Sequence, residues 1–283
     1  MIEGGILDSH VHLFNLEGVG YSWLENNRSL GWDHYPEDYS AATYGLDIDS
    51  IVVVEAAPDD GTKEAAWIDE LAKSDVRIKG MVAHADVDRG SSVRDQLDQL
   101  KRFPLVKGVR RLIKYEQDDS FCVSDRFLQG VQALSDYGYT FDVCISYPQT
   151  ERAIELVEKC PDIRMVLDHM GTPLVKDAVI KPWQRLMSRL AENPNIYCKV
   201  SSILTEANWR RYETEQVRPF VEHLLEVFGP GRCMWGGDWP VSAEAAPYHD
   251  HLRVVDEITA GMSASDRRKL FHDTAVEFYR LES

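Results

Sequence analysis

The chain has 283 residues, of which 44% are hydrophobic and 28% are charged, a composition that is typical of globular domains and excludes a disordered chain. Its formal net charge of −16 disfavours binding to nucleic acids, whose phosphates it would repel. No apolar run approaches the roughly 20 residues that cross a bilayer, so we expect no membrane span. One domain over residues 1–283 is predicted.

The beginning of the chain and its cysteines indicate where the protein works. The first apolar run opens at Gly5, which leaves no room for a secretory signal after Met1. The cysteines are odd in number and lack a CxxC pair, so we interpret them as reduced core residues and expect a cytoplasmic protein. They are Cys122, Cys144, Cys160, Cys198 and Cys233.

Eight apolar runs recur along the chain, and each is followed by helical periodicity or turn residues. Most runs are too continuously hydrophobic for an exposed antiparallel sheet, and they suit parallel strands that are covered on both faces. This pattern predicts an α/β fold, a single-domain (β/α)8 TIM barrel, which typically needs about 250 residues. The runs are 5–12, 49–56, 78–85, 106–114, 139–146, 163–169, 196–201 and 232–238.

The segment 15–47 departs from the alternation. It is rich in Trp, Tyr, Asn and Gly and has no clear period. As a long first βα loop it would either cover the mouth of the barrel or form a surface excursion, and the sequence leaves both interpretations open.

Histidine and aspartate side chains lie at the carboxyl ends of the predicted strands, where such barrels carry their catalytic residues. His10 and His12 are two residues apart on a strand, so both imidazoles point to the same side. His169 ends the sixth run and Asp238 ends the eighth. We expect these four to form an active site with Asp238 as general base, although an aspartate before Trp-Pro could also simply cap a turn.

Basic and aromatic residues near these strand ends are candidates for binding a substrate. A guanidinium group could hold a carboxylate or a polyhydroxylated compound through paired hydrogen bonds. The alternative is that the cations pair with the abundant Asp and Glu. The predicted substrate-binding residues are Arg110, Arg111, Tyr147, Lys199 and Trp239.

Seven stretches and the terminal helix resemble the amidohydrolase superfamily. The likeness is greatest to the branch of L-fuconolactonases, L-rhamnono-lactonases and 2-pyrone-4,6-dicarboxylate lactonases, and it runs from end to end with the same order and spacing. The stretches are DSHVH, VVVEAAP, KGVRRLI, FDVCI, LDHMGTP, YCKVSSILTEANW and MWGGDWPV, with the closing helix through residues 278–281.

The resemblance implies an active-site core of His10, His12, His169 and Asp238, with Asp238 activating water. In some members of the superfamily the equivalent residues hold zinc or another divalent ion, whereas several lactonases of this branch work without a metal. For this chain the resemblance therefore implies either one divalent ion, zinc first, held by the same four residues, or no metal.

Two departures from the family pattern bear on this expectation. Binuclear members use a histidine at the end of strand five and a bridging lysine or carboxylate on strand four, where this chain has 144–146 (Cys-Ile-Ser) and 110–111 (Arg-Arg). A binuclear centre is therefore not expected. The stretch 13–15 (Leu-Phe-Asn) replaces a tryptophan-containing continuation, which leaves the substrate open.

The expected activity is hydrolysis of a small lactone of a sugar acid or a dicarboxylate, within carbohydrate metabolism. Water deprotonated by Asp238 would attack the carbonyl, and the histidines, directly or through a metal, would stabilise the oxyanion. The alternatives are a metal-dependent decarboxylase of an aromatic or enol acid, a lactone isomerase, and a non-catalytic sugar-acid binder. A homo-oligomer is compatible with the resemblance, but no interface is visible in the sequence.

Overall fold

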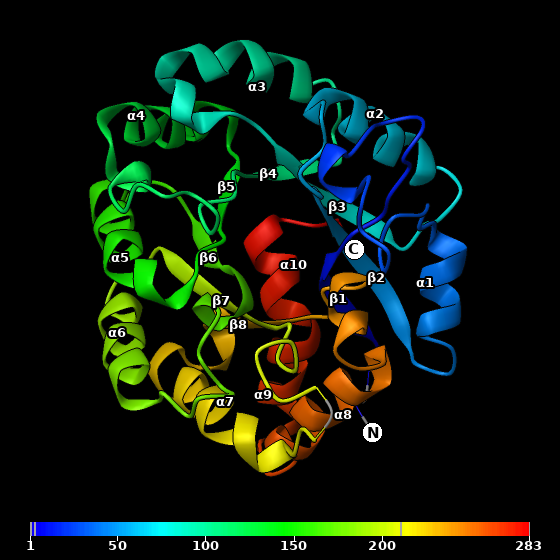
Figure 1. Cartoon of the computed structure of the whole chain (residues 1–283), viewed down its shortest axis with the longest axis vertical. Helices are drawn as coiled ribbons and strands as arrows, with labels where there is room; N and C mark the ends of the chain where they lie inside the picture. Colours follow the sequence, from blue (N-terminus) through cyan, green and yellow to red (C-terminus); the bar gives the residue numbers. More distant parts are fainter. Residues whose placement is uncertain (1, 3, 210, 283) are drawn as a thin grey trace.

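The computed structural model describes residues 2, 4–209 and 211–282, so residues 1, 3, 210 and 283 of the predicted domain lie outside the described part. Eight parallel strands follow one another around a single sheet in chain order (Figure 1). The sheet closes where the backbone N–H of Asp238 donates to the carbonyl of His10 at 2.7 Å. The strands are β1 (Ile6–Val11), β2 (Ile48–Val54), β3 (Ile78–His84), β4 (Val106–Arg110), β5 (Thr140–Val143), β6 (Met165–Leu167), β7 (Ile196–Ser201) and β8 (Cys233–Gly236).

All eight predicted strands are confirmed, and the fold is the predicted barrel. The main difference lies at the fourth run, where β4 ends at Arg110 and residues 111–114 turn away from the sheet. Helices between the strands form the outer ring (Figure 1). The helices are α1 (Pro36–Ala42), α2 (Gly61–Leu71), α3 (Arg94–Leu100), α4 (Asp125–Ala133), α5 (Thr150–Lys159), α6 (Lys181–Ala191), α7 (Thr214–Phe228), α8 (Tyr248–Thr259), α9 (Ala264–Arg268) and α10 (Thr274–Tyr279).

Helix α10 closes one end of the barrel, and Figure 1 shows it inside the ring of helices. Phe278 and Tyr279 are buried against strand residues that face the interior, such as Val52. The guanidinium group of Arg280 donates to the carbonyl of Gly138, which precedes β5. The helix therefore covers the amino ends of the strands, and the carboxyl ends remain available for a site.

The first βα segment folds over the opposite end, the mouth of the barrel. The backbones of Phe14 and His34 exchange two hydrogen bonds, of 3.0 and 2.9 Å, which join the beginning of the segment to the residue just before α1. Leu24 and Leu30 pack around the buried ring of Phe14. The segment also contains α1, which the aperiodic sequence did not predict. Of the two interpretations of residues 15–47, the structure supports a cover over the mouth.

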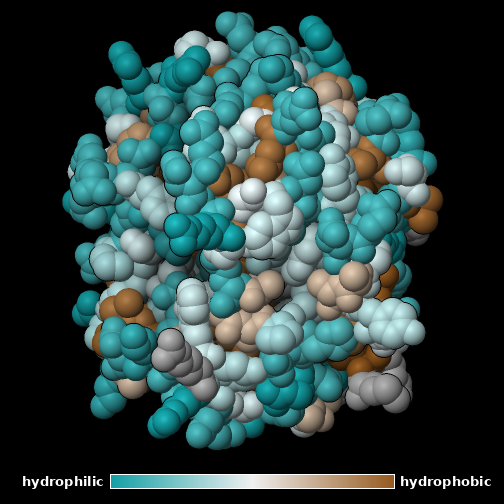
Figure 2. Space-filling model, turned by 45° about the vertical axis from the view of Figure 1, so that its right-hand side comes forward, coloured by the Kyte–Doolittle hydropathy of each residue, from teal (hydrophilic) through white to brown (hydrophobic). Residues whose placement is uncertain are grey.

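The surface seen in Figure 2 is mostly hydrophilic, with apolar residues in small separate groups. Among the described residues, no helix is long and apolar enough to cross a membrane. All five cysteines are buried and none is paired in a disulfide. This agrees with their interpretation as core residues.

Candidate active site

The four residues predicted from the strand ends meet at the carboxyl end of the barrel. Oδ1 of Asp238 lies 3.3 Å from Nε2 of His12, 3.7 Å from Nε2 of His10 and 3.9 Å from Nε2 of His169. The other carboxylate oxygen accepts a hydrogen bond of 2.6 Å from the hydroxyl group of Ser202. One oxygen of Asp238 thus faces three imidazoles, while the other is held by the protein.

Strained backbone directs the side chains at three of these strand ends. His169, Ser202 and Asp238 have φ angles of +52°, +52° and +56°, in the left-handed region that side chains other than glycine rarely adopt. Each such residue costs of order 1 kcal/mol or more, and such strain concentrates at functional sites. The three residues follow β6, β7 and β8, so the strain lies where the side chains converge.

Gly237 allows β8 to approach its neighbours closely just before Asp238. A Cβ atom at this position would lie 2.3 Å from the ring of Tyr248 and 2.5 Å from Oδ2 of Asp8. The carboxylate of Asp8 also accepts a 2.7 Å hydrogen bond from the backbone N–H of Gly237. A larger residue would displace this turn, and Asp238 with it.

A hydrogen bond determines which nitrogen of His12 carries a proton, and His10 lies between charged neighbours. Nδ1 of His12 lies 2.8 Å from the carbonyl oxygen of Val54, which can only accept, so this nitrogen carries the proton. Nδ1 of His10 lies 3.1 Å from Nζ of Lys199. Nδ1 of His10 also lies 3.5 Å from Oδ1 of Asp168, and its Nε2 lies 3.3 Å from Nε2 of His12.

Lys199 is completely buried beneath His10. Its Nζ lies 2.5 Å from Oδ2 of Asp142 and 3.1 Å from Oδ1 of Asp168. Burial alone would lower the pKa of Lys199, but these two carboxylates raise it, so the lysine is protonated. Burial, together with the Lys199 ammonium, in turn holds the pKa of His10 well below its ordinary value and keeps this imidazole neutral.

Arg110 brings a second cation to the same place. Its Nε donates to Oε1 of Glu55 at 2.6 Å, and its Nη1 lies 3.2 Å from Oδ2 of Asp168 and 3.3 Å from Nε2 of His10. Burial would raise the pKa of Glu55, but Arg110 holds it below the ordinary range. The guanidinium group is thus fixed beside the histidines.

The site opens into a cavity of about 490 Å³ at the barrel mouth. His12, Arg110, His169 and Asp238 line its inner end. The first loop forms another part of the lining, with Phe14, Trp23, Asn27 and Leu30. Such a volume suits a small molecule.

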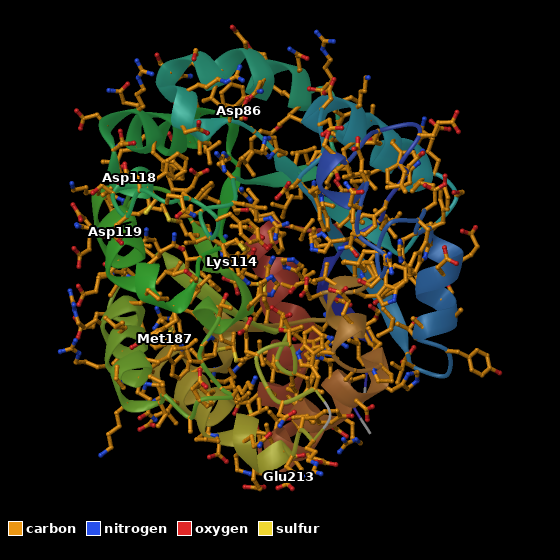
Figure 3. All side chains as sticks on the ribbon, viewed as in Figure 1. Asp86, Lys114, Asp118, Asp119, Met187 and Glu213 are labelled. Carbon is orange, nitrogen blue, oxygen red and sulfur yellow. The ribbon has the colours of Figure 1, made fainter. Side chains whose placement is uncertain are left out.

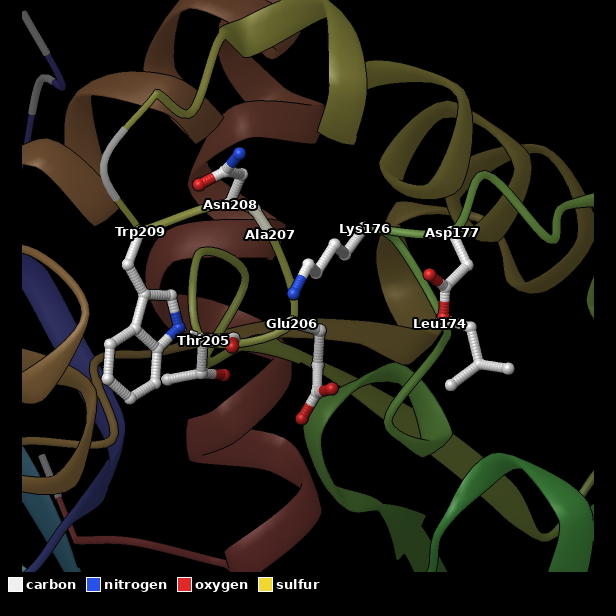
Figure 4. A pocket seen from close by; sticks show the side chains of 8 residues that line it. All are labelled: Leu174, Lys176, Asp177, Thr205, Glu206, Ala207, Asn208 and Trp209. Carbon is white, nitrogen blue, oxygen red and sulfur yellow. Dashed lines mark hydrogen bonds between the residues drawn. The ribbon is translucent and has the colours of Figure 1, made fainter.

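A second, more open hollow of about 420 Å³ adjoins the cavity (Figure 4). It shares Thr205 and Glu206 with the cavity and includes Lys176 and Trp209. Trp209 is 51% exposed, and its indole N–H donates to the carbonyl of Thr205 at 2.7 Å. The loop after β7 therefore borders both spaces.

Of the predicted substrate-binding residues, Arg110 lines the cavity and four others do not. Arg111 pairs with Asp88 and Glu116. Lys199 lies in the ion cluster beneath His10. Tyr147 opens the 3-10 turn after β5, and Trp239 is 5% exposed and packs against the rings of His34 and Tyr39.

The sequence did not single out the residues that support the core histidines. Ser201 Oγ lies 2.9 Å from Nδ1 of His169. Asp142 and Asp168 hold Lys199, and the Tyr279 hydroxyl donates to Asp142 at 2.9 Å. Charged residues inside otherwise apolar strands, such as Asp142 in β5, were the available signal, because burying them alone would be costly.

The donor atoms around Asp238 fit one divalent ion. Possible ligand atoms of His10, His12 and Asp238 lie within 4.8 Å of one another, and imidazole nitrogens with a carboxylate oxygen suit zinc. Nε2 of His12 offers a lone pair, because the proton of this imidazole is on Nδ1. A second group, His10, Asp168 and His169, is less suitable because Lys199 and Arg110 already occupy Asp168.

Comparison with known proteins identifies the family of this barrel. The sequence profile of the amidohydrolase family matches residues 7–281. The chain belongs to the amidohydrolase family. A crystal structure of an amidohydrolase from Burkholderia multivorans with bound zinc has a TM-score of 0.88, with 26% identity over 99% of this chain and 100% of that one.

Curated relatives of this amidohydrolase include named enzymes. L-fucono-1,5-lactonase of Burkholderia multivorans is 28% identical over 97% of this chain and 96% of its own length. L-rhamnono-gamma-lactonase of Scheffersomyces stipitis is 25% identical over 98% of each chain. The relatives thus align with nearly the whole barrel.

Proposed function

We propose that this amidohydrolase opens the ester ring of a small lactone with a water molecule activated by Asp238. The observation that carries the proposal is the position of Asp238, whose Oδ1 faces three imidazoles at the inner end of the cavity. The named relatives that hydrolyse lactones support the substrate class.

Asp238 is placed to accept a proton from a water molecule, because it lines the inner end of the cavity and Ser202 holds only one of its two carboxylate oxygens. The other carboxylate oxygen can therefore orient a water molecule. It accepts a proton from this water as the water oxygen attacks the carbonyl carbon of the lactone. When the ring C–O bond breaks, the same proton passes to the leaving alkoxide, which gives the hydroxy acid.

Arg110 and His169 are the proposed donors to the oxyanion that forms on the lactone carbonyl. Both line the cavity beside Asp238. Burial lowers the pKa of His169 to about 4, so its imidazole is neutral. With the Ser201 hydroxyl donating to its Nδ1, the remaining proton lies on Nε2, on the side of Asp238. Two fixed donors at a developing negative charge can each contribute a rate factor of about 100 or more.

A divalent ion, zinc first, would be held by His10, His12 and Asp238. When bound, it would lower the pKa of a water molecule and polarise the carbonyl. Asp238 would in either case remain the group that orients the nucleophile.

The test is a pH-indicator assay on a panel of sugar lactones and unsaturated cyclic esters, with metal analysis and with and without a chelator. The proposal expects release of one equivalent of acid per lactone opened. Release of CO2 without net hydrolysis would replace the proposal with decarboxylation. A rearranged lactone without acid would replace it with isomerisation, and binding without turnover would show a non-catalytic sugar-acid binder.

A further inference from the structure

The cavity as a whole carries an unequal set of charges. Its lining has two cations, Arg110 and Lys114, and three carboxylates, Asp238, Glu206 and Glu244. Arg110 is already neutralised by Glu55 and Asp168. A substrate that enters the outer cavity therefore meets one further cation and two further carboxylates.

Lys114 and Glu206 are available to a ligand. Figure 3 places Lys114 near the centre of the ring of helices, whereas Asp118 and Asp119 lie at its edge. Among the described residues, neither Lys114 nor Glu206 has an ion-pair partner within 4.0 Å, although Lys114 lowers the pKa of Glu206, which burial raises above its ordinary value. The two charges influence each other across a gap that a ligand could span.

The first loop contributes hydrogen-bonding groups on another part of the lining. The Oδ1 atom of Asn27 accepts from the backbone N–H groups of Ser29 and Leu30, each at 3.0 Å, which fixes the side chain. The amide nitrogen of Asn27 has no partner among the described residues and remains a donor. Glu244, which accepts from the Ser29 hydroxyl, has a second carboxylate oxygen to offer.

Aromatic surface completes the wall. Trp23 is 44% exposed although its indole N–H donates to the carbonyl of Ala56 at 2.8 Å, so the ring is fixed while part of it stays open. Phe14 lines the cavity behind it at a ring distance of 6.1 Å. Fixed aromatic faces combined with carboxylates suit a ligand that has apolar C–H surfaces and many hydroxyl groups.

We propose that Glu206 and Lys114 are specificity residues that bind the hydroxyl groups of a neutral polyhydroxylated lactone and reject lactones with two carboxylates. The inference rests on the proposed lactone hydrolysis and narrows its substrate. Hydroxyl groups can donate to Glu206 and Glu244 and accept from Lys114 and Asn27. A dianionic lactone would lie against the carboxylates of Glu206 and Glu244 with only Lys114 as an additional counterion. The resulting charge repulsion would select against such a lactone.

The test compares kcat/KM for three substrates of the purified full chain. They are a neutral hexono-1,5-lactone, δ-valerolactone as its hydroxyl-free counterpart, and 2-pyrone-4,6-dicarboxylate as a dianion. The proposal expects kcat/KM for the hexonolactone to exceed that for either of the others by about ten-fold or more, one charged hydrogen bond being worth at least that factor. A preference for the dianion would overturn it.

Variants assign the effect to residues. Glu206→Gln and, separately, Lys114→Met should each raise KM for the hexonolactone about ten-fold. The increase in KM for δ-valerolactone should be at least five-fold smaller. Glu206→Lys should improve turnover of the dianion. The matched control is Glu158→Gln, an exposed glutamate on α5, which should change neither value. Equal KM values for the wild type and both cavity variants would overturn the assignment.

Recognition is separated from hydrolysis by an aldonolactam, in which an NH group replaces the ring oxygen. Calorimetric titration should show binding to the wild type and weaker binding to Glu206→Gln. If the lactam binds in this way while no lactone is opened, specificity for polyhydroxylated rings stands and the proposed hydrolysis fails. If lactones are opened but Glu206→Gln changes neither the binding of the lactam nor KM for the hexonolactone, the specificity proposal fails and the proposed hydrolysis stands.

Discussion

The ammonium nitrogen of Lys199 lies 3.1 Å from Nδ1 of His10 at the completely buried base of the site. The same nitrogen contacts Asp142 and Asp168. The carboxylates of Asp142 and Asp168, the ammonium group of Lys199 and the neutral imidazole of His10 therefore contact one another out of reach of water.

Lys199→Met should destabilise the fold strongly, because it leaves two buried carboxylates without their shared cation. Breaking a buried ion pair on one side costs about 3–5 kcal/mol, and urea denaturation measures the loss. Adding Asp142→Asn to the variant should restore part of the stability. Lys73→Met, which removes an exposed lysine paired with Glu70, should cost less than about 1 kcal/mol. A similarly small loss for Lys199→Met would contradict the ion cluster.

Ser201→Ala should lower kcat about ten-fold and change KM little, because Ser201 holds His169 rather than the substrate. The hydroxyl lies 2.9 Å from Nδ1 of His169, and losing an orienting hydrogen bond costs about 1 kcal/mol or slightly more. Steady-state kinetics on an accepted lactone measures both constants. Ser188→Ala removes a comparable contact, 3.3 Å from His223 on the outer helices, and should leave kcat unchanged. An unchanged kcat in Ser201→Ala would remove this positioning role.

Glu64 should make the stability of the fold depend on pH. Burial raises the pKa of this carboxyl group from 4.5 to about 8, so the folded protein keeps a proton that the unfolded chain releases. Between these values the folded state binds more protons, and stability falls as the pH rises from about 4.5 to 8. Glu64→Gln should flatten this decline in urea denaturation measured at several pH values, whereas exposed Glu158→Gln should not. A parallel decline in Glu64→Gln would contradict the assignment.

The barrel could be predicted from the sequence because each strand is buried on both faces and therefore appears as a continuous apolar run. The convergence of His10, His12, His169 and Asp238 followed, since barrel strands bring their carboxyl ends together. Substrate-binding residues were harder to predict. The sequence shows that Arg110 and Arg111 are adjacent, but alternation in and after β4 sends only Arg110 into the cavity, while Arg111 pairs at the surface.

The role of Lys199 depended on tertiary contacts that no local pattern contains. Its partners Asp142 and Asp168 lie on β5 and directly after β6, so only the closed barrel shows that these carboxylates neutralise its charge. The same holds for Glu206 and Lys114, which come from loops after β7 and β4 and line the same cavity. Loop conformation, rather than strand periodicity, determines those positions.

The central claim is that Asp238 activates water, and the most direct measurement is single-turnover hydrolysis of an accepted lactone by Asp238→Asn. Asparagine keeps the shape and can still accept from Ser202, but it cannot accept the proton of water. The account predicts an unchanged thermal midpoint and a rate lower by a factor of at least about 100, the lower scale of general acid–base catalysis. A variant that folds normally and hydrolyses the lactone at near the wild-type rate would contradict it.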